Sequence, residues 1–153
     1  PKPSSAASDV YKRQVSEATR RGYELELSGQ LTPSWQLQGS YVVNDSSLTS
    51  ASTSPRKQFK LASTYRLDGM LSGLTLGAAT RWQSSANAGV LKQSSFWLLD
   101  LMARYQVTPK LSVSANVNNL FDKAYFSGMR DFGRIQYTWG APRSFNLGVR
   151  YDF

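Results

Sequence analysis

The sequence predicts an all-β chain that forms part of an antiparallel transmembrane β-barrel. Three observations lead to this fold class: apolar and polar residues alternate along most of the chain, short and long connections follow in turn, and aromatic residues gather near the ends of the alternating runs. A side-chain period of two describes a strand with one apolar and one polar face. The run from Ser144 to Phe153 ends on an aromatic residue, as outer-membrane barrels do, although alone it also fits an edge strand of a soluble β-sandwich.

Alternating runs recur along the chain and are separated by turn signals. We expect about seven strands, or about six if the stretch from Gly133 to Trp139 is only loop. The runs are Tyr23–Gln30, Trp35–Asn44, Phe59–Leu67, Leu74–Gln83, Trp97–Tyr105, Leu111–Asn118 and Ser144–Phe153. The segment from Ser95 to Tyr105 also fits an amphipathic helix, because Asp100 and Arg104 have i, i+4 spacing, but its neighbours favour a strand.

The connections between the runs alternate in length. Short turns begin at Thr32, Asp68 and Thr108, and long polar stretches begin at Asn44, Ser84 and Phe126. Outer-membrane barrels have short periplasmic turns and long extracellular loops, because each strand crosses the bilayer. A sandwich has no reason for this alternation, so the loop lengths favour the membrane barrel.

Aromatic residues mark both ends of the runs. Those at the short-turn end are Trp35, Tyr65, Tyr105, Tyr151 and Phe153, and those near the other end are Tyr41, Phe59, Trp82, Trp97 and Phe145. Aromatic side chains are enriched where a membrane meets water, so these two sets predict two interfacial girdles.

The polar face of the runs carries charges of both signs. The charged residues are Glu24, Glu26, Lys60, Arg66, Arg81, Asp100, Arg104, Arg150 and Asp152. We expect them to face the barrel lumen and to pair across neighbouring strands, which keeps the wall hydrated and rigid. A role in holding a plug domain is the alternative.

Composition narrows the function classes. The 153 residues include no cysteine and no histidine, which removes Ser-His-Asp and Cys-His catalysis and His-ligated zinc. The net charge is +8, but the basic residues are spread out and form no stripe, so nucleic acid is not an expected partner. We therefore expect no enzyme and no covalently bound cofactor.

Residues 1–14 do not share the alternating pattern. They lack the apolar core of a secretory signal. They resemble an adapter-derived lead found on translated metagenomic fragments. We therefore expect a non-native or disordered lead over residues 1–14, and a barrel segment of a truncated chain over residues 15–153.

Several motifs resemble the carboxyl end of TonB-dependent siderophore receptors. They are Val117–Tyr125, Gly140–Phe145 and Arg150–Phe153, preceded in the family's order by Arg21–Glu26, Leu31–Trp35, Pro55–Lys57 and Asp100–Tyr105. The resemblance covers roughly residues 16–153 and is greatest to the branch that imports ferric hydroxamate and related siderophores. It implies a barrel of about 22 strands around a plugged lumen, with this chain as the last six strands or so.

The resemblance implies active import by a receptor in the outer membrane of a Gram-negative cell. An iron(III)-siderophore chelate would bind outside, and the TonB complex would rearrange a plug domain that this sequence does not contain. The siderophore would hold the iron, so no protein metal site is expected. Outer-membrane lipid, lipopolysaccharide and the barrel assembly machinery are the other implied partners. A passive porin-like or structural barrel is the alternative, although the motifs at Asn118–Asp122 and Gly140–Arg143 argue against it.

A candidate ligand-contacting loop extends from Phe126 to Trp139. Arginine provides planar donors for an anionic, oxygen-rich chelate, and aromatic rings provide stacking area. The candidate residues are Arg130, Phe132, Arg134, Tyr137 and Trp139. Alternatively, Arg130 and Arg134 contact lipopolysaccharide phosphates or pair with Asp131. At the opposite end, the resemblance makes Tyr151 and Phe153 the expected assembly signal.

Overall fold

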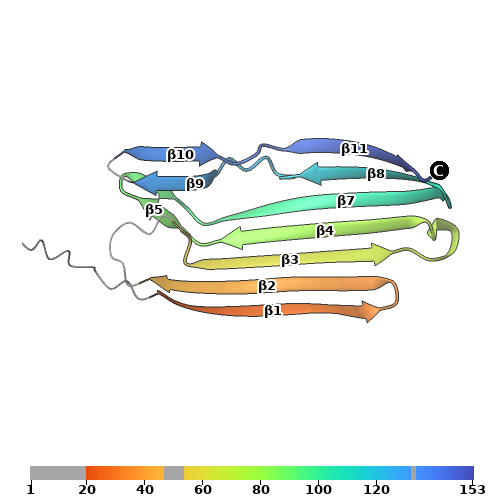
Figure 1. The fold of residues 1–153 in the computed structure, drawn as a ribbon, viewed down its shortest axis with the longest axis horizontal. Coiled ribbons are helices and arrows are strands. Elements are labelled where there is room, and N and C mark those ends of the chain that lie inside the picture. The colour runs from red at the N-terminus through yellow and green to blue at the C-terminus, as the bar shows by residue number, and fades with distance from the viewer. Residues whose placement is uncertain (1–19, 47–53, 132–133) are drawn as a thin grey trace, which may run out of the picture.

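The computed structural model describes residues 20–46, 54–131 and 134–153, which form a seven-stranded antiparallel sheet with two short hairpins at one end (Figure 1). In spatial order the sheet consists of β1 (Arg20–Thr32), β2 (Trp35–Ser46), β3 (Lys57–Arg66), β4 (Leu74–Gln83), β7 (Phe96–Thr108), β8 (Leu111–Asn118) and β11 (Ser144–Tyr151). A 3₁₀ turn, η1 (Gly69–Leu71), lies between β3 and β4. None of the helical segments in the described ranges is long and apolar enough to cross a membrane. The boundary expected after residue 14 lies outside the described residues.

The two hairpins occupy stretches that the sequence predicted as loops. One contains β5 (Ala86–Ala88) and β6 (Leu91–Gln93), and the other contains β9 (Phe126–Asp131) and β10 (Ile135–Trp139). The loop prediction is therefore wrong for Ser84–Ser94 and for the stretch that begins at Phe126, whereas the alternative of a strand within Gly133–Trp139 is confirmed. The physical reason is that a long connection must find partners for its own N–H and C=O groups, and folding back on itself provides them.

The strand register confirms the predicted faces. Trp82 lies directly opposite Phe59 on β3 and Trp97 on β7, while the next residue, Gln83, lies opposite Gln58 and Phe96. Directly opposed residues share a face, and a slip of one residue would mix the apolar and polar sides. The apolar faces of all seven strands lie on the same side of the sheet. The segment from Ser95 to Tyr105 contributes to strand β7 and does not form a helix.

The aromatic rows follow the two ends of the sheet. Tyr41, Phe59, Trp82 and Trp97 are successive neighbours across β2, β3, β4 and β7. The ring centroids of Trp82 and Trp97 are 6.1 Å apart. At the other end Trp35 lies directly opposite Tyr65. At roughly 3.3 Å per residue these rows are about 20 Å apart along β2, which suits the apolar band of a barrel wall.

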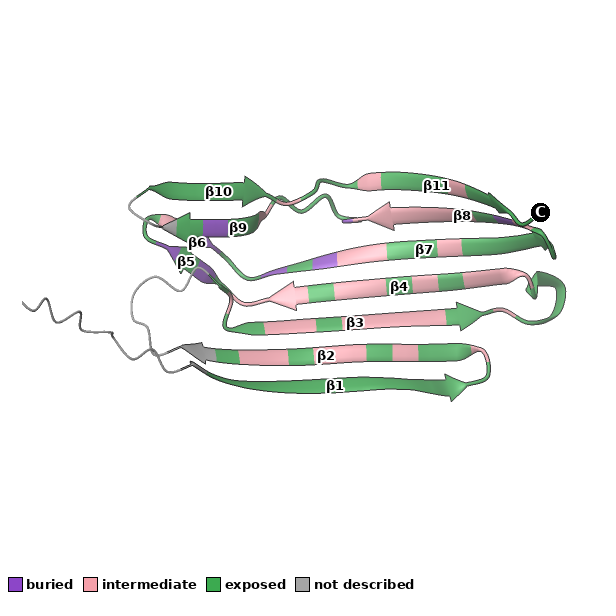
Figure 2. Cartoon of the chain, in the orientation of Figure 1, coloured by how far each residue is buried: buried purple, intermediate pink, exposed green. Residues whose placement is uncertain are grey.

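The two ends of the sheet differ in packing. The short turns and the carboxyl terminus lie at one end, and both hairpins lie at the other (Figure 1). The buried apolar residues gather at the hairpin end, on β5, β7 and β9 (Figure 2); they are Ala86, Ala88, Phe96, Leu98 and Met129. By contrast Leu147, on the apolar face of β11, is 85% exposed. The hairpin end is therefore the part of the chain with a small interior of its own.

The charged residues of the polar face pair less than expected. Among the described residues, one ion pair joins neighbouring strands, between Arg81 Nη2 and Asp100 Oδ2 at 3.9 Å. A second, between Arg150 Nε and Asp152 Oδ1 at 3.0 Å, joins β11 to the residue that follows its end. Most of the predicted cross-strand pairs therefore do not form within this sheet.

Candidate functional site

A hollow of about 200 Å³ lies on the polar face near the hairpin end of the sheet. Its lining includes Gln58, Lys60 and Arg81 from β3 and β4, together with Phe96 of β7 and Tyr125. Gln58, Lys60 and Arg81 belong to the polar face of the strands, which the alternation predicts to face a water-filled lumen. The rings of Phe96 and Tyr125 pack against each other at a centroid distance of 4.8 Å and a tilt of 36°, and they form an aromatic side of the hollow.

The hollow is positively charged. Lys60 and Arg81 lie directly opposite each other on β3 and β4, and both side chains are exposed. Like charges in this position repel. The compensation from Asp100 is weak, because its Oδ2 approaches Arg81 only to 3.9 Å and its Oδ1 accepts the Asn119 N–H at 2.7 Å. This arrangement suits an anionic oxygen group.

Two apolar residues of β7, Phe96 and Leu98, occupy positions that the alternation of polar and apolar residues predicts to face the lumen. Phe96 and Leu98 are only 6% and 3% exposed. Tyr125, in the connection between β8 and β9, covers Phe96 from the polar side. The next residue, Phe126, donates its N–H to Oε1 of the buried Gln93 at 2.7 Å. The connection therefore folds inward over the sheet and forms part of the site.

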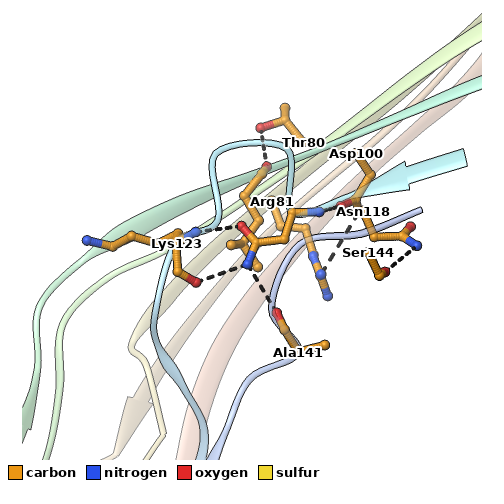
Figure 3. A network of polar contacts seen from close by, with 9 residues as sticks. Thr80, Arg81, Asp100, Asn118, Lys123, Ala141 and Ser144 are labelled. Carbon is orange, nitrogen blue, oxygen red and sulfur yellow. Dashed lines mark hydrogen bonds and ion pairs between the residues drawn. The ribbon is translucent and has the colours of Figure 1, made fainter.

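A group of hydrogen bonds joins the two chain segments that connect the β9–β10 hairpin to the sheet (Figure 3). We call Asn119, Asp122, Lys123, Ala141 and Arg143 the Asn119 clasp. Asn119 Nδ2 donates to the backbone oxygens of Lys123 and Ala141, at 3.0 and 3.1 Å, and Oδ1 accepts the Lys123 N–H at 2.9 Å. Asp122 Oδ1 accepts the Arg143 N–H at 2.8 Å. The motif that carried the family resemblance thus has a structural role in this chain.

One face of the hairpin beyond the clasp is aromatic. It carries Phe126, Tyr137 and Trp139, whose ring centroids lie 4.6 to 6.1 Å apart. Met129 lies directly opposite Tyr137 and therefore on the same face, and it packs against Ala86 and Ala88 of β5. The two hairpins therefore support each other, while Tyr137 and Trp139 keep 52% and 60% of their surface exposed.

The structure separates the residues predicted to contact ligand. Tyr137 and Trp139 lie together on the aromatic face. Arg130 lies directly opposite Gln136 and therefore on the other face of the hairpin. Arg134 is exposed just before β10 begins, and Phe132 lies outside the described residues. The described members thus form a two-sided surface, with rings on one face and Arg130 on the other.

The predicted assembly residues lie at the opposite end of the sheet from the hairpins. The rings of Tyr151 and Phe153 are 5.1 Å apart and meet at 78°. Both side chains are exposed, and the Asp152 N–H continues the ladder by donating to the Lys110 backbone oxygen at 2.9 Å.

Sequence reasoning did not identify several residues that shape the site. Phe126 and Met129 pack the hairpin against β5, and Gln93 accepts a hydrogen bond from Phe126, its first residue. Asn119 forms hydrogen bonds with both connections of the hairpin. Asn119 and Asp122 have φ angles of 50° and 51°, a left-handed conformation that asparagine and aspartate adopt more readily than most residues. An asparagine and an aspartate directly after an alternating run could have indicated this turn.

Comparison with known proteins gives a consistent assignment. The family model "TonB dependent receptor-like, beta-barrel" matches residues 2–120. The ferripyoverdine receptor of Pseudomonas aeruginosa is 40% identical over 90% of this chain and 18% of its own length. The catecholate siderophore receptor Fiu of Escherichia coli is 30% identical over 86% of this chain and 19% of its own length.

Solved structures agree with this assignment. The crystal structure of the P. aeruginosa ferripyoverdine receptor bound to ferripyoverdine superposes with a TM-score of 0.75 and 35% identity, covering 89% of this chain and 20% of the receptor. The chain therefore spans about a fifth of the length of the receptors that it matches, and its sheet corresponds to part of a barrel wall. The matched family model and these relatives show that the chain belongs to the TonB-dependent receptor β-barrel family of the bacterial outer membrane.

Proposed function

We propose that the chain forms part of the barrel of an outer-membrane receptor that imports a ferric siderophore with energy supplied through TonB. The observation that carries this proposal is the 40% identity to a ferripyoverdine receptor over 90% of the chain. The function is binding and transport, in which iron(III) is cargo held by the siderophore.

The hairpin end supports the proposal through its chemistry. The hollow presents Lys60 and Arg81 beside the packed Phe96 and Tyr125 rings. Cationic donors next to aromatic surface suit an anionic chelate with flat groups. The narrower assignment to hydroxamate siderophores remains a prediction, because the relatives are named for pyoverdine and catecholate ligands.

Uptake in a defined genetic background tests this proposal. The full-length receptor that contains this segment is expressed in P. aeruginosa lacking its own ferripyoverdine receptor, and uptake of radiolabelled ferripyoverdine is measured. We expect uptake that requires TonB. Equal uptake without TonB would instead support a passive porin-like barrel. An empty vector and the native receptor serve as controls.

The β9–β10 hairpin is our candidate for direct ligand contact. We expect the double substitution Arg130→Ala and Arg134→Ala to weaken ferripyoverdine binding by at least about tenfold at equal surface expression, because each arginine can donate charge-assisted hydrogen bonds. Lys92→Ala, an exposed cation on the neighbouring β6, is the matched control. Unchanged binding with increased envelope permeability would favour lipopolysaccharide as the partner of the two arginines.

Tyr151 and Phe153 are proposed to serve recognition by the barrel assembly machinery. Their position far from the hairpins separates this role from ligand binding. Deletion of Phe153 should therefore lower the amount of receptor in the outer membrane without changing the affinity of the assembled molecules. Equal surface amounts, measured by immunoblotting of outer-membrane fractions, would contradict this role.

A further inference from the structure

We propose that Asn119 is a positioning residue that fixes the base of the β9–β10 hairpin next to Tyr125, which lines the hollow. This inference rests on the proposed function for its consequence in binding, but its structural part can be tested without any ligand. Asn119 is 3% exposed, and its side chain binds both the connection that leaves the sheet and the connection that returns to it.

The side-chain contacts of Asn119 join segments far apart in sequence. Its amide makes two hydrogen bonds to the backbone of Lys123 and one to the Ala141 oxygen, at 2.9 to 3.1 Å. Because Lys123 precedes β9 and Ala141 follows β10, the Asn119 side chain bridges the two connections at the base of the hairpin. An asparagine is suited to this task because its amide both donates and accepts.

The backbone of Asn119 attaches this base to the sheet. Its N–H donates to Asp100 Oδ1 of β7 at 2.7 Å, and its oxygen accepts the Asp122 N–H at 2.8 Å. Asp100 is also the partner of Arg81 in the hollow. Asp100 therefore links the hairpin base to Arg81, one of the charged residues of the candidate site.

The barrel wall does not depend on the Asn119 side chain. The β8–β11 ladder runs from the Asn118–Ser144 pair to the Leu111–Tyr151 pair, and Asn118 Nδ2 adds its own bond to Ser144 Oγ at 3.2 Å. Loss of the Asn119 amide should therefore loosen the hairpin base while the wall strands remain paired. The Asp122–Arg143 and Gly140–Tyr125 hydrogen bonds and the packing of Met129 on β5 would then be among the remaining restraints on the hairpin.

Two substitutions of Asn119 and one of a neighbouring residue separate an effect on the hairpin from an effect on the wall. Asn119→Gly removes the amide but tolerates the φ of 50°, so it tests the side chain without adding backbone strain. Asn119→Asp keeps an oxygen that can accept the Lys123 N–H but loses both amide donations. Asn118→Ala removes a polar contact one residue earlier, on the wall, and is the matched control.

The experiment uses the full-length receptor in the outer membrane of intact cells. Cleavage by added trypsin after Arg130 and Arg134 measures the mobility of the hairpin. Heat-modifiable migration measures the assembly of the barrel wall, and ferripyoverdine is the ligand used to measure binding. We expect Asn119→Gly to speed hairpin cleavage at least about tenfold and to weaken ferripyoverdine binding, with Asn119→Asp intermediate or similar. Surface level and heat-modifiable migration should match those of Asn118→Ala.

Two results would overturn the inference. The first is a cleavage rate for Asn119→Gly equal to that of the unsubstituted receptor. The second is failure of both Asn119 variants to assemble while Asn118→Ala assembles normally, because Asn119 would then hold the wall and not the hairpin. Absence of ferripyoverdine binding by the unsubstituted receptor would count against the proposed function alone, since faster cleavage would still support the clasp.

Discussion

At the scale of single residues, the close approach of Tyr125 to the backbone of residue 140 requires a glycine at that position. A Cβ added to Gly140 would overlap the ring of Tyr125, which packs against Phe96. The Gly140 N–H also donates to the Tyr125 oxygen at 2.8 Å, so the two backbones are fixed beside each other. The aromatic side of the hollow therefore exists because residue 140 is a glycine.

Gly140→Ala should destabilise the receptor by about 1–3 kcal/mol, because overpacking forces the Tyr125 ring away from Phe96. Urea unfolding of the full-length receptor in detergent, followed by tryptophan fluorescence, measures this change. Gly29→Ala on β1 is the control, since an added Cβ would meet nothing within 4 Å, and its effect should stay within about 0.5 kcal/mol. Equal effects of the two substitutions would show that the Tyr125 ring moves freely.

At the scale of elements, each strand has one face for the membrane and one for water. On β11, Leu147 lies opposite Ala115 on the apolar side, and Asn146 lies opposite Asn116 on the polar side. Register with β8 fixes this assignment along the whole strand. Neighbouring residues on one strand should therefore respond very differently to the same substitution.

Leu147→Lys should lower the free energy of unfolding by about 2–4 kcal/mol near the bilayer midplane, because the ammonium group would face hydrocarbon. Asn146→Lys, one residue earlier, places the new charge in the aqueous lumen and should lower the free energy of unfolding much less. Folding into lipid vesicles across a denaturant series compares the two variants. A larger loss for Asn146→Lys would mean that the faces are assigned the wrong way round.

At the scale of the whole molecule, the sheet formed by the described residues is open. β1 and β11 are its outermost strands, and within the described residues each has one sheet neighbour. The outer edges present unpaired backbone groups, each of which costs several kcal/mol in hydrocarbon. In the relatives, which are about five times longer, further chain is present that could pair with such edges.

The 153-residue chain by itself should therefore not form a stable closed barrel. Refolded in detergent, it should aggregate or remain sensitive to proteinase K, as judged by size-exclusion chromatography and digestion. The full-length receptor, refolded in the same detergent, is the control. A monodisperse, heat-resistant monomer of the short chain would show that these strands close on themselves.

The sequence by itself determined the barrel wall, which is the sheet of β1–β4, β7, β8 and β11. Strict alternation in runs such as Ser144–Tyr151 specifies both strand and face, because only one register keeps all apolar side chains on one side. The alternation of short and long connections likewise determined which ends of the strands lie together. These properties are local or periodic, so they can be predicted from the sequence without coordinates.

Only the tertiary structure decided the site. The hairpins β5–β6 and β9–β10 have short strands, and they are fixed by contacts between distant segments, such as Met129 on Ala88. The position of Asn119 beneath Ala141 and the packing of Tyr125 against Phe96 also join residues more than 20 apart. No periodicity specifies such contacts, because they arise when a long connection folds inward to satisfy its own backbone and bury its few apolar side chains.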